Sequence, residues 1–365
     1  MKRITITPAW YFSDEAGNQI DPTLFLLLEA VHRHGKLTRA AEDVGVSYRH
    51  AWNLLNKWGE FFGIPLAELA RGRGARLSPL GEKLLWAEQR VIARLGPQLE
   101  SLGSELNLAI QQQLEGVQPV LRLHASHGFA VELLPKHLRE LRLDLQYCSP
   151  REALVALRRG ACDLAGFHLP QGEVGKAISR DYRDLLKPRS HRVIGFITRR
   201  QGLMVAPGNP KGLRDLEGLA GGSLRFINRQ AASGTRALLD GLLAMEGIAA
   251  SRIRGYEVEE YTHSAVAAYV AAGMADAGFG VEAAARRFGL DFVPLAMEHY
   301  LLVCHQRSLA EPRFAFLLEV LKSETFQSAV KALPGYAPNR CGEVTSVEAL
   351  FEETDPASWR EASAF

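Results

Sequence analysis

The spacing of apolar residues changes about a third of the way along the chain. Over residues 22–34 apolar side chains recur at helical spacing. The segment LTRAAEDVGVSYRHAWNLLNKWGEFFG (37–63) predicts two short amphipathic helices that meet at Gly45. After a Gly/Arg-rich loop, a longer helical pattern runs from about residue 79 to 115. The first third is therefore expected to be almost entirely helical.

Beyond the break GVQPV at residues 116–120, short apolar runs alternate with helical segments. The helical segments include PREALVALRRG and GTRALLDGLLAMEG, and the apolar runs are VLRLHA, LDLQYC, CDLAGFHL, RVIGFI, SLRFIN and LDFVPLA. This alternation predicts an α/β domain with a mainly parallel sheet. Ligands of open α/β sheets bind at the edge where the strands end, so the loops after the strands are the places to search for a site.

These changes divide the chain into four expected parts. Residues 1–80 form a helical head, 81–118 a linking helix, 119–343 the α/β domain, and 344–365 a polar, acidic tail that is expected to be loosely ordered. A length of 365 residues fits two or three domains.

Composition limits the class of protein and the cellular compartment that we expect. The net charge of +2 means that any affinity for nucleic acid must come from a local basic surface. The four cysteines form no CxxC pair, which argues against a zinc site or a disulfide framework. The N-terminus MKRITITPAWYFSDEAG has no apolar core of a signal peptide, and no run approaches membrane-spanning length. We expect a cytoplasmic protein with no membrane partner.

The head has the order of elements of a helix-turn-helix. Thr38 is expected to cap the first short helix and Ser47 the second, whose early residues would face base edges. Arg49 suits guanine and Lys57 suits phosphate. Trp52, Leu55, Trp58 and Phe62 are interpreted as core. The predicted DNA-binding residues are Thr38, Ser47, Tyr48, Arg49, His50, Asn53 and Lys57, with Arg71, Arg73 and Arg76 from the ARGRGAR loop. A helical bundle that binds no DNA is the alternative.

Residues 22–94 also resemble a known family. GKLTRAAEDVGVSYRHAWNLLNKW followed by GARLSPLGEKLL is similar to the winged helix-turn-helix of ModE-type molybdate-responsive regulators and their LysR-like relatives. The matching positions are Thr38, Ala40, Ala41, Ser47, Tyr48, Ala51, Trp52, Leu77 and Gly81, whereas Ser78 replaces the usual Thr. The resemblance implies a homodimer, or a homotetramer built from dimers, joined through the helix after Gly81 and bound to near-palindromic operator DNA.

The stretch FINRQAASGTRALLD (226–240) places Ser-Gly-Thr-Arg between a strand and a helix. The free amides at a helix N-terminus attract anions, and hydroxyl groups add donors. A plain N-cap explains the same residues equally well. Ser126, His127 and Gly128 occupy a similar position after an earlier strand.

A second resemblance covers residues 120–336. HASHGFAVELLP, NRQAASGTR and the segment from YTHSAVAAY to HYLLV are similar to the periplasmic-binding-protein-like domain fused to helix-turn-helix regulators, and to molybdate- and tungstate-binding proteins. Ala231-Ala232 departs from the pattern, where relatives more often carry a glycine. The implied fold class is α/β, with an N-terminal winged helix-turn-helix and a C-terminal two-lobed type II periplasmic-binding-protein-like fold.

The predicted ligand site combines both lobes. Its residues are Ser126, His127, His168, Asn228, Arg229, Ser233, Gly234, Thr235, Arg236 and Tyr261. Amides and hydroxyl groups would surround an anion, and a guanidinium would bind it through two hydrogen bonds. His168 is equally explained as a core residue, and Arg229 as a partner of Glu259 or Glu260.

Enzymatic alternatives have little support in the sequence. GFGVEA at 278–283 imitates a dinucleotide fingerprint but is interpreted as a strand-to-helix turn. GxSxG, HExxH and a Walker lysine loop are missing, and His32 with His34 lacks a third metal ligand.

The sequence therefore predicts a one-component transcription regulator with no cofactor and no metal. Its effector would be a small anion, either molybdate or tungstate, or a small carboxylate such as formate. The alternative is a molybdenum-handling storage or cofactor-assembly protein with a vestigial helix-turn-helix.

Overall fold

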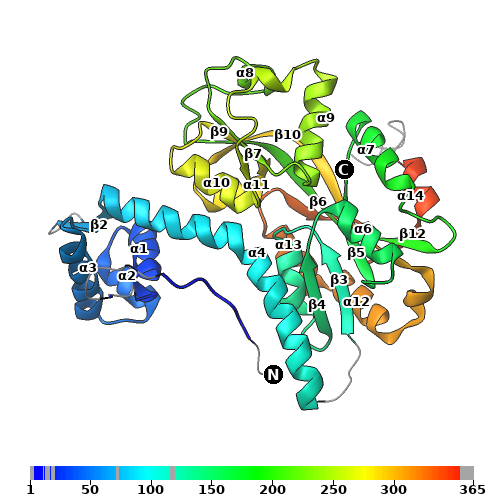
Figure 1. Cartoon of the computed structure of the whole chain (residues 1–365), viewed down its shortest axis with the longest axis horizontal. Coiled ribbons are helices and arrows are strands. Elements are labelled where there is room, and N and C mark those ends of the chain that lie inside the picture. Colours follow the sequence, from blue (N-terminus) through cyan, green and yellow to red (C-terminus); the bar gives the residue numbers. More distant parts are fainter. Residues whose placement is uncertain are drawn as a thin grey trace. The chain divides into compact units, whose positions relative to one another are not determined.

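The computed structural model describes residues 4–10, 12, 17, 21–70, 74–115 and 120–353 (Figure 1). The chain divides into two compact units, Thr7–Gly96 and Met1–Ile6 with Pro97–Phe365. We call the first the head and the second the sensor, and describe each by itself.

The head is a winged helix-turn-helix, as predicted. Helices α1 (Thr23–His34), α2 (Leu37–Val44) and α3 (Tyr48–Phe62) are followed by the antiparallel hairpin of β1 (Ala67–Ala70) and β2 (Gly74–Leu77). Their apolar faces share one buried core that includes Leu27, Leu28, Ala40, Leu55 and Trp58. The hairpin is the wing, and its tip at 71–73 lies outside the described residues.

Local signals set the ends of α2 and α3, although two expectations for this segment are wrong. Gly45 adopts a left-handed φ of 75° and ends α2, and the Ser47 hydroxyl accepts a hydrogen bond from the His50 amide at 3.1 Å to cap α3. The expectation that Thr38 caps α2 is wrong, because the N-cap is Lys36 and Thr38 lies exposed inside the helix. Trp52 also departs from its expected core position, being 45% exposed.

Helix α4 (Pro79–Glu115) is one 37-residue element that begins in the head and ends in the sensor. Its first turn lies very close to Leu66, the residue that precedes β1. A Cβ on Gly81 would be 2.1 Å from the carbonyl oxygen of Leu66. Only glycine permits this approach.

The sensor is built on a mixed sheet rather than the mainly parallel sheet that the alternation suggested. Its strand order is β4-β3-β5-β10-β6-β9-β7-β8. Parallel pairing joins β3 (Val120–Ala125) to β4 (Arg142–Tyr147) and β5 (Leu164–Pro170), and β7 (Phe226–Arg229) to β8 (Glu259–Glu260) and β9 (Ala277–Val281). Both groups are joined through antiparallel pairs, which alternation alone does not reveal.

Two long strands connect these groups. β6 (His191–Val205) and β10 (Asp291–His305) have 15 residues each and pair with one another in antiparallel register. β10 also pairs with β5, while the later part of β6 pairs with β9. We call the part around β3, β4 and β5 the first lobe and the part around β7, β8 and β9 the second lobe, so β6 and β10 run through both.

Helices cover the sheet in both lobes (Figure 1). In the second lobe these are α8 (Leu216–Leu219), α9 (Gly234–Met245), α10 (His263–Ala271) and α11 (Glu282–Arg287), with the short 3₁₀ turn η2 (Ala250–Arg252). The remaining helices are η1 (Val131–Leu133), α5 (Leu134–His137), α6 (Pro150–Arg158), α7 (Glu173–Arg183), η3 (Gln306–Ala310), α12 (Pro312–Lys322) and α13 (Glu324–Lys331). As expected, GFGVEA is the turn between β9 and α11.

The C-terminal segment is more ordered than its polarity suggested. β11 (Tyr336–Pro338) and β12 (Val344–Ser346) pair with β6, and α14 (Val347–Glu353) follows. Val347 is fully buried and packs in a core cluster with residues of α6 and β5. The tail expectation therefore fails for residues 344–353, while 354–365 lie outside the described residues.

The close approach at Gly81 yields a stability test. We expect Gly81→Ala to lower the free energy of unfolding of the head by about 1–3 kcal/mol, because the backbone near Leu66 must move. Gly59→Ala in α3 is the control, since its Cβ would meet its nearest atom at 3.4 Å and alanine favours a helix by up to about 1 kcal/mol. Urea unfolding measures both, and equal effects from the two variants would contradict the explanation.

Candidate functional site

Two helices of the second lobe begin with free amides. At α9 the Ser233 hydroxyl accepts a hydrogen bond from the Arg236 amide at 3.1 Å, and at α10 the Thr262 hydroxyl accepts one from the Ala265 amide at 3.0 Å. Within the described chain, the amides of Gly234 and Thr235, and of His263 and Ser264, donate no hydrogen bond to the backbone. Each helix therefore combines a satisfied cap with amides available to an anion.

A buried polar chain lies in the middle of the two long strands. Glu298 on β10 is the register partner of Arg199 on β6. The Oε2 atom of Glu298 accepts hydrogen bonds from Arg199 Nε and from Gln201 Nε2, both at 2.8 Å. Relative exposures are 1% for Arg199 and 0% for Gln201 and Glu298, so these charges and dipoles act in a low dielectric.

This polar chain reaches both lobes. In the first lobe, Arg199 Nη2 lies 3.3 Å from Nδ1 of His168 on β5. In the second lobe, Gln201 Nε2 donates to the Thr235 hydroxyl at 3.2 Å, within the first turn of α9. A short series of hydrogen bonds thus connects β5 to α9 through the paired strands.

Two glycines bring backbone close to the same groups. A Cβ on Gly234 would be 2.8 Å from Cδ2 of His168, and a Cβ on Gly128 would be 3.4 Å from Nη1 of Arg199. The turn at Gly128 follows β3, and its carbonyl accepts hydrogen bonds from the Val131 and Glu132 amides. The loop after β3 and the start of α9 therefore meet around one buried cluster.

Arg229 is a second buried arginine of the cluster. Its Nη2 donates to the Tyr261 carbonyl at 2.9 Å, its Nε donates to Gln230, and the residue is 5% exposed. Burial and then repulsion from Arg199 lower the pKa of Arg229 to about 9, while Glu298 opposes the shift. An anion beside Arg229 would favour its charged form and so oppose the lowering of its pKa.

The histidines of the cluster are neutral at pH 7. Burial, followed by the charge of Arg199, lowers the pKa of His168 to about 3. Burial, followed by Arg229 and Arg199, holds the pKa of His263 well below its ordinary value. Burial opposes ionisation of Glu298, but Arg199 keeps its pKa below the usual range. The cluster therefore contains two guanidinium groups, one carboxylate and uncharged imidazoles.

Several buried atoms of the cluster have no hydrogen-bond partner in the described chain. They are Nη1 of Arg199, Nδ1 of His263, and the Oε1 atoms of Gln201 and Glu298. Leaving such atoms unpaired costs about 1–3 kcal/mol each, so the arrangement favours a polar ligand.

The predicted ligand residues divide into two groups. The structure brings His168, Gly234, Thr235 and Arg229 to the cluster. Ser126 donates to the Cys148 carbonyl at 3.3 Å, and its own carbonyl accepts from Tyr300.

The remaining predicted ligand side chains serve the second lobe itself. Arg236 pairs with Asp240 and Glu259 and stacks on Tyr256, 4.0 Å from the ring centroid. The Asn228 amide group donates to the Tyr256 carbonyl. Ser233 acts as the N-cap, and Tyr261 provides its carbonyl to Arg229 while its side chain is 44% exposed. Glu259 thus pairs with Arg236 rather than with Arg229.

The sequence patterns did not point to Arg199, Gln201 or Glu298 as site residues, whereas His263 was expected beside Tyr261. The available signal was a run of polar residues inside an otherwise apolar strand, as in FITRRQGLMV and PLAMEHYLLV. Charged side chains in the interior of a buried strand are rare unless they are paired or functional.

The head presents a second candidate surface. Tyr48, Arg49, His50, Asn53 and Lys57 are exposed on α3, opposite the buried Ala51, Leu54, Leu55 and Trp58. Thr38 and Ser47 are exposed beside them in the chain. On the wing, Arg76 pairs with Glu68 at 2.8 Å, whereas Arg71 and Arg73 lie outside the described residues. This polar, basic face suits a nucleic-acid groove.

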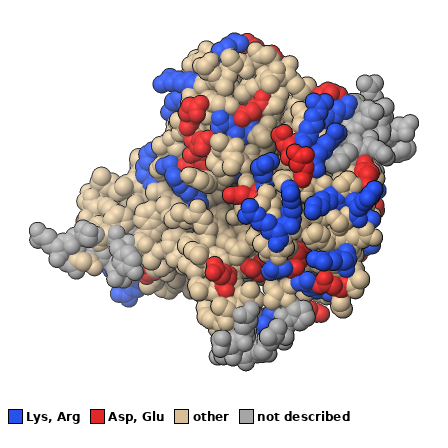
Figure 2. All heavy atoms as spheres, turned by 45° about the vertical axis from the view of Figure 1, so that its right-hand side comes forward, with Lys and Arg blue, Asp and Glu red and all other residues tan. Residues whose placement is uncertain are grey.

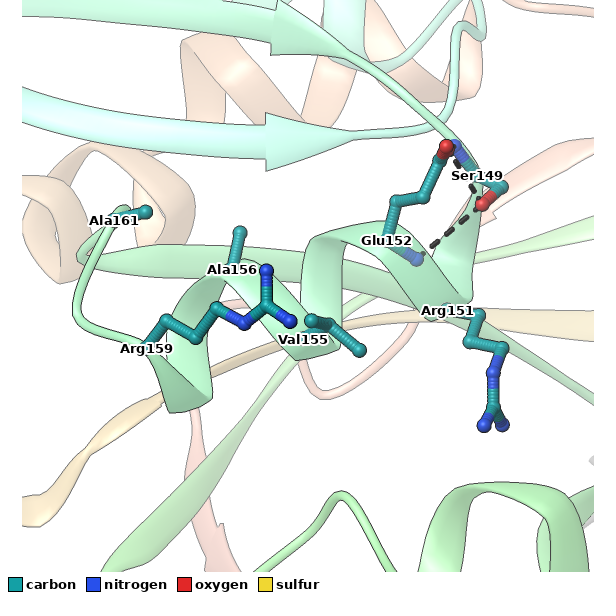
Figure 3. Close-up of a pocket in the computed structure, with 7 residues that line it drawn as sticks. All are labelled: Ser149, Arg151, Glu152, Val155, Ala156, Arg159 and Ala161. Carbon is teal, nitrogen blue, oxygen red and sulfur yellow. Dashed lines mark hydrogen bonds between the residues drawn. The ribbon is translucent and has the colours of Figure 1, made fainter.

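A shallow groove on the first lobe is separate from the buried cluster. It has a volume of about 430 Å³ and runs along α6 between Ser149 and Ala161. Figure 3 shows that Ser149 and Glu152 bond to one another as a capping box, while Arg151 points away. Lys and Arg side chains gather on this side of the sensor (Figure 2). Two of its polar lining residues, Ser149 and Glu152, are already paired with one another in the cap.

Comparison with known proteins decides the family. Residues 131–322, more than half of the chain, match the PBP superfamily domain. The chain belongs to the PBP superfamily. Residues 23–82 match the bacterial regulatory helix-turn-helix protein of the lysR family. This PBP superfamily member is therefore a DNA-binding transcriptional regulator with an effector-binding domain, and not an enzyme.

The relatives match this chain over segments of different lengths. YvgK of Bacillus subtilis strain 168, an uncharacterized protein, is 31% identical over 223 residues, covering 60% of this chain and 72% of YvgK. The molybdenum-pterin-binding protein MopB of Rhodobacter capsulatus is 31% identical over 124 residues, 33% of this chain and 45% of MopB. The OxyR C206 mutant of Corynebacterium glutamicum is 18% identical with a TM-score of 0.42, covering 86% of this chain and 95% of that one. In the described chain no helix has the length and apolar character of a membrane span.

Proposed function

We propose that this PBP superfamily regulator is a one-component sensor in which a small oxyanion binds between the two lobes and alters operator binding in the cytoplasm. The observation that carries this proposal is the pair of buried arginines, Arg199 and Arg229, beside the free amides at the start of α9 and α10. Molybdate, tungstate, or a small carboxylate such as formate belongs to the class of ligand that such donors bind.

The position of the cluster explains how binding changes the protein. β6 and β10 run through both lobes, and the chain from His168 to Thr235 crosses them at Arg199, Gln201 and Glu298. An anion held by Arg199 and by the amides of α9 stabilises the arrangement in which the lobes are closed. Such couplings typically amount to about 1–3 kcal/mol.

Helix α4 provides the mechanical connection to the head. The hydroxyl groups of Ser101 and Ser104 accept hydrogen bonds from the amides of Tyr147 and Leu145 on β4, each at 3.0 Å. The C-terminal half of α4 is thereby fixed to the first lobe. Because α4 continues through Pro97 to Pro79, this helix is the covalent route by which a movement of the first lobe would reach the head.

The names of two relatives suggest molybdate as the effector. MopB is described as a molybdenum-pterin-binding protein, and a molybdenum transport protein ModE of Herbaspirillum seropedicae is 36% identical over 77 residues, 20% of this chain and 29% of that one. These names support molybdate as a candidate effector. The same names fit the alternative of a molybdenum storage or cofactor-assembly protein. In that protein α3 would bind no operator DNA.

An apolar stripe on α4 supports a dimer. Leu102, Leu106 and Ile110 follow helical spacing on one side of the sensor part of α4 and are 43–51% exposed. A second copy of α4 packed along this stripe would bury these side chains. The dimer would present two heads to a two-fold operator.

The anion site is tested by Arg229→Met, which removes the guanidinium but keeps an unbranched side chain. We expect the affinity for the effector anion to fall at least about tenfold, because a charge-assisted hydrogen bond is lost in a buried site. Calorimetry with molybdate, tungstate and formate measures the change, and circular dichroism checks the fold. Arg225→Met is the matched control, since Arg225 is 45% exposed and pairs with Asp276. Unchanged affinity in Arg229→Met would refute the site.

The exposed face of α3 is tested for DNA binding with DNA from upstream of the protein's own operon. Arg49→Ala should weaken specific binding by about 1–3 kcal/mol and relax base preference, whereas Lys57→Ala should reduce the salt slope by about 0.9 per phosphate contact. Fluorescence anisotropy at several salt concentrations measures both. Arg252→Ala in the sensor is the control. If the two variants change neither the affinity for DNA nor its salt dependence, the alternative with a vestigial helix-turn-helix is favoured.

The dimer is tested by Leu102→Glu combined with Leu106→Glu. Two buried charges on each helix oppose association, so we expect a monomer by light scattering and weaker operator binding. Met245→Glu is the control, because Met245 is an apolar residue away from α4 that is 60% exposed. This variant should keep the wild-type mass in light scattering. A double variant that stays dimeric places the interface elsewhere.

A further inference from the structure

The buried cluster contains acceptors as well as donors. Arg199 Nε and Gln201 Nε2 both donate to Oε2 of Glu298, so the second carboxylate oxygen, Oε1, receives neither bond. In the described chain this Oε1 and the Oε1 of Gln201 are buried without a hydrogen-bond partner. Both residues are 0% exposed.

The residues that carry these acceptors are hydrogen-bonded to groups of the proposed anion site. Gln201 Nε2 bridges the Glu298 carboxylate and the Thr235 hydroxyl, and Thr235 contributes one of the free amides of α9. Arg199, which binds the same carboxylate, lies against Gly128 on the other side. A ligand that contacts the amide of Thr235 and the guanidinium of Arg199 is therefore a neighbour of Glu298.

An ionised carboxylate accepts hydrogen bonds and donates none. A tetrahedral oxyanion without a proton, such as molybdate, tungstate or sulfate, also offers only acceptors at neutral pH. Next to Glu298 such an ion would meet like charge in a low dielectric, which is costly. An anion that carries its own O–H would instead donate to the unpaired oxygen and accept from the arginines and amides.

We propose that the effector is a small oxyanion that bears a hydroxyl group, that is, a 2-hydroxycarboxylate or a hydrogen-bearing oxyanion such as phosphate. The donor group binds Glu298 or Gln201, and the anionic group binds Arg199, Arg229 and the amides of α9. This inference rests on the proposed function and narrows it, because it ranks hydroxyl-bearing anions above molybdate and tungstate.

The test uses the full-length protein and pairs of anions that differ in the hydroxyl. Lactate is compared with propionate, and phosphate with sulfate and molybdate, by calorimetry and thermal shift at pH 7 and constant ionic strength. We expect the hydroxyl-bearing member of each comparison to bind at least about tenfold more tightly, because its partner leaves a buried acceptor unpaired.

The variant Glu298→Gln tests whether the carboxylate of Glu298 causes the preference for hydroxyl-bearing anions. Its amide keeps the size of the side chain but adds N–H donors, so the preference should fall to about threefold or less and proton-free anions should bind better. Glu217→Gln, which changes a side chain that is 62% exposed, is the matched control and should retain the wild-type preference.

The outcomes separate this inference from the proposed function. If molybdate or sulfate binds the wild-type protein as tightly as the hydroxyl-bearing anions, or if folded Glu298→Gln keeps the preference, the inference is overturned and the oxyanion sensor stands. If no anion binds or shifts the melting temperature, both fail. The wild-type comparison remains decisive when Glu298→Gln does not fold.

Discussion

The ion pair between Arg199 and Glu298 constrains how the two long strands of the sensor pack against one another. It lies at the centre of the two strands that run through both lobes, where neither charge reaches solvent. Breaking one partner of such a pair typically costs about 3–5 kcal/mol, because the remaining charge stays buried. Replacing both partners by apolar residues is often neutral or stabilising, so stability alone does not account for a buried pair. Its bonds to His168 and, through Gln201, to Thr235 give it a second role in connecting the lobes.

Much of the fold followed from local patterns in the sequence. The strands near residues 120, 142, 164, 191, 226 and 291 and the helix from Pro79 appear where apolar periodicity indicated. Ser47 and Ser233 cap their helices because each hydroxyl reaches the amide three residues later. Thr38 does not cap α2 because the helix already begins at Leu37, which is buried, so the N-cap is Lys36. The direction of β6 and β10 depends on long-range pairing, so alternation of strands and helices could not show that the sheet is mixed.

The candidate site was only partly predictable for the same reason. His168, Arg229, Gly234 and Thr235 belong to motifs at strand ends or helix starts, where a local signal exists. Arg199 and Glu298 are 99 residues apart, and only the register of β6 against β10 makes them neighbours. Arg236 appeared suited to an anion from its place in SGTR, but Asp240 and Glu259 satisfy its guanidinium. A guanidinium near a helix start is available to a ligand only when no nearby carboxylate engages it first.

The contact of α4 with β4 has a consequence for solubility as well as for signalling. β4 is the outermost strand of the sheet, and the serine hydroxyl groups of α4 occupy amides that an extended chain would otherwise pair with. A helix that peeled away to signal would uncover a template for aggregation. The part of α4 that contacts β4 therefore covers the amides of an edge strand as well as joining the sensor to the rest of the chain.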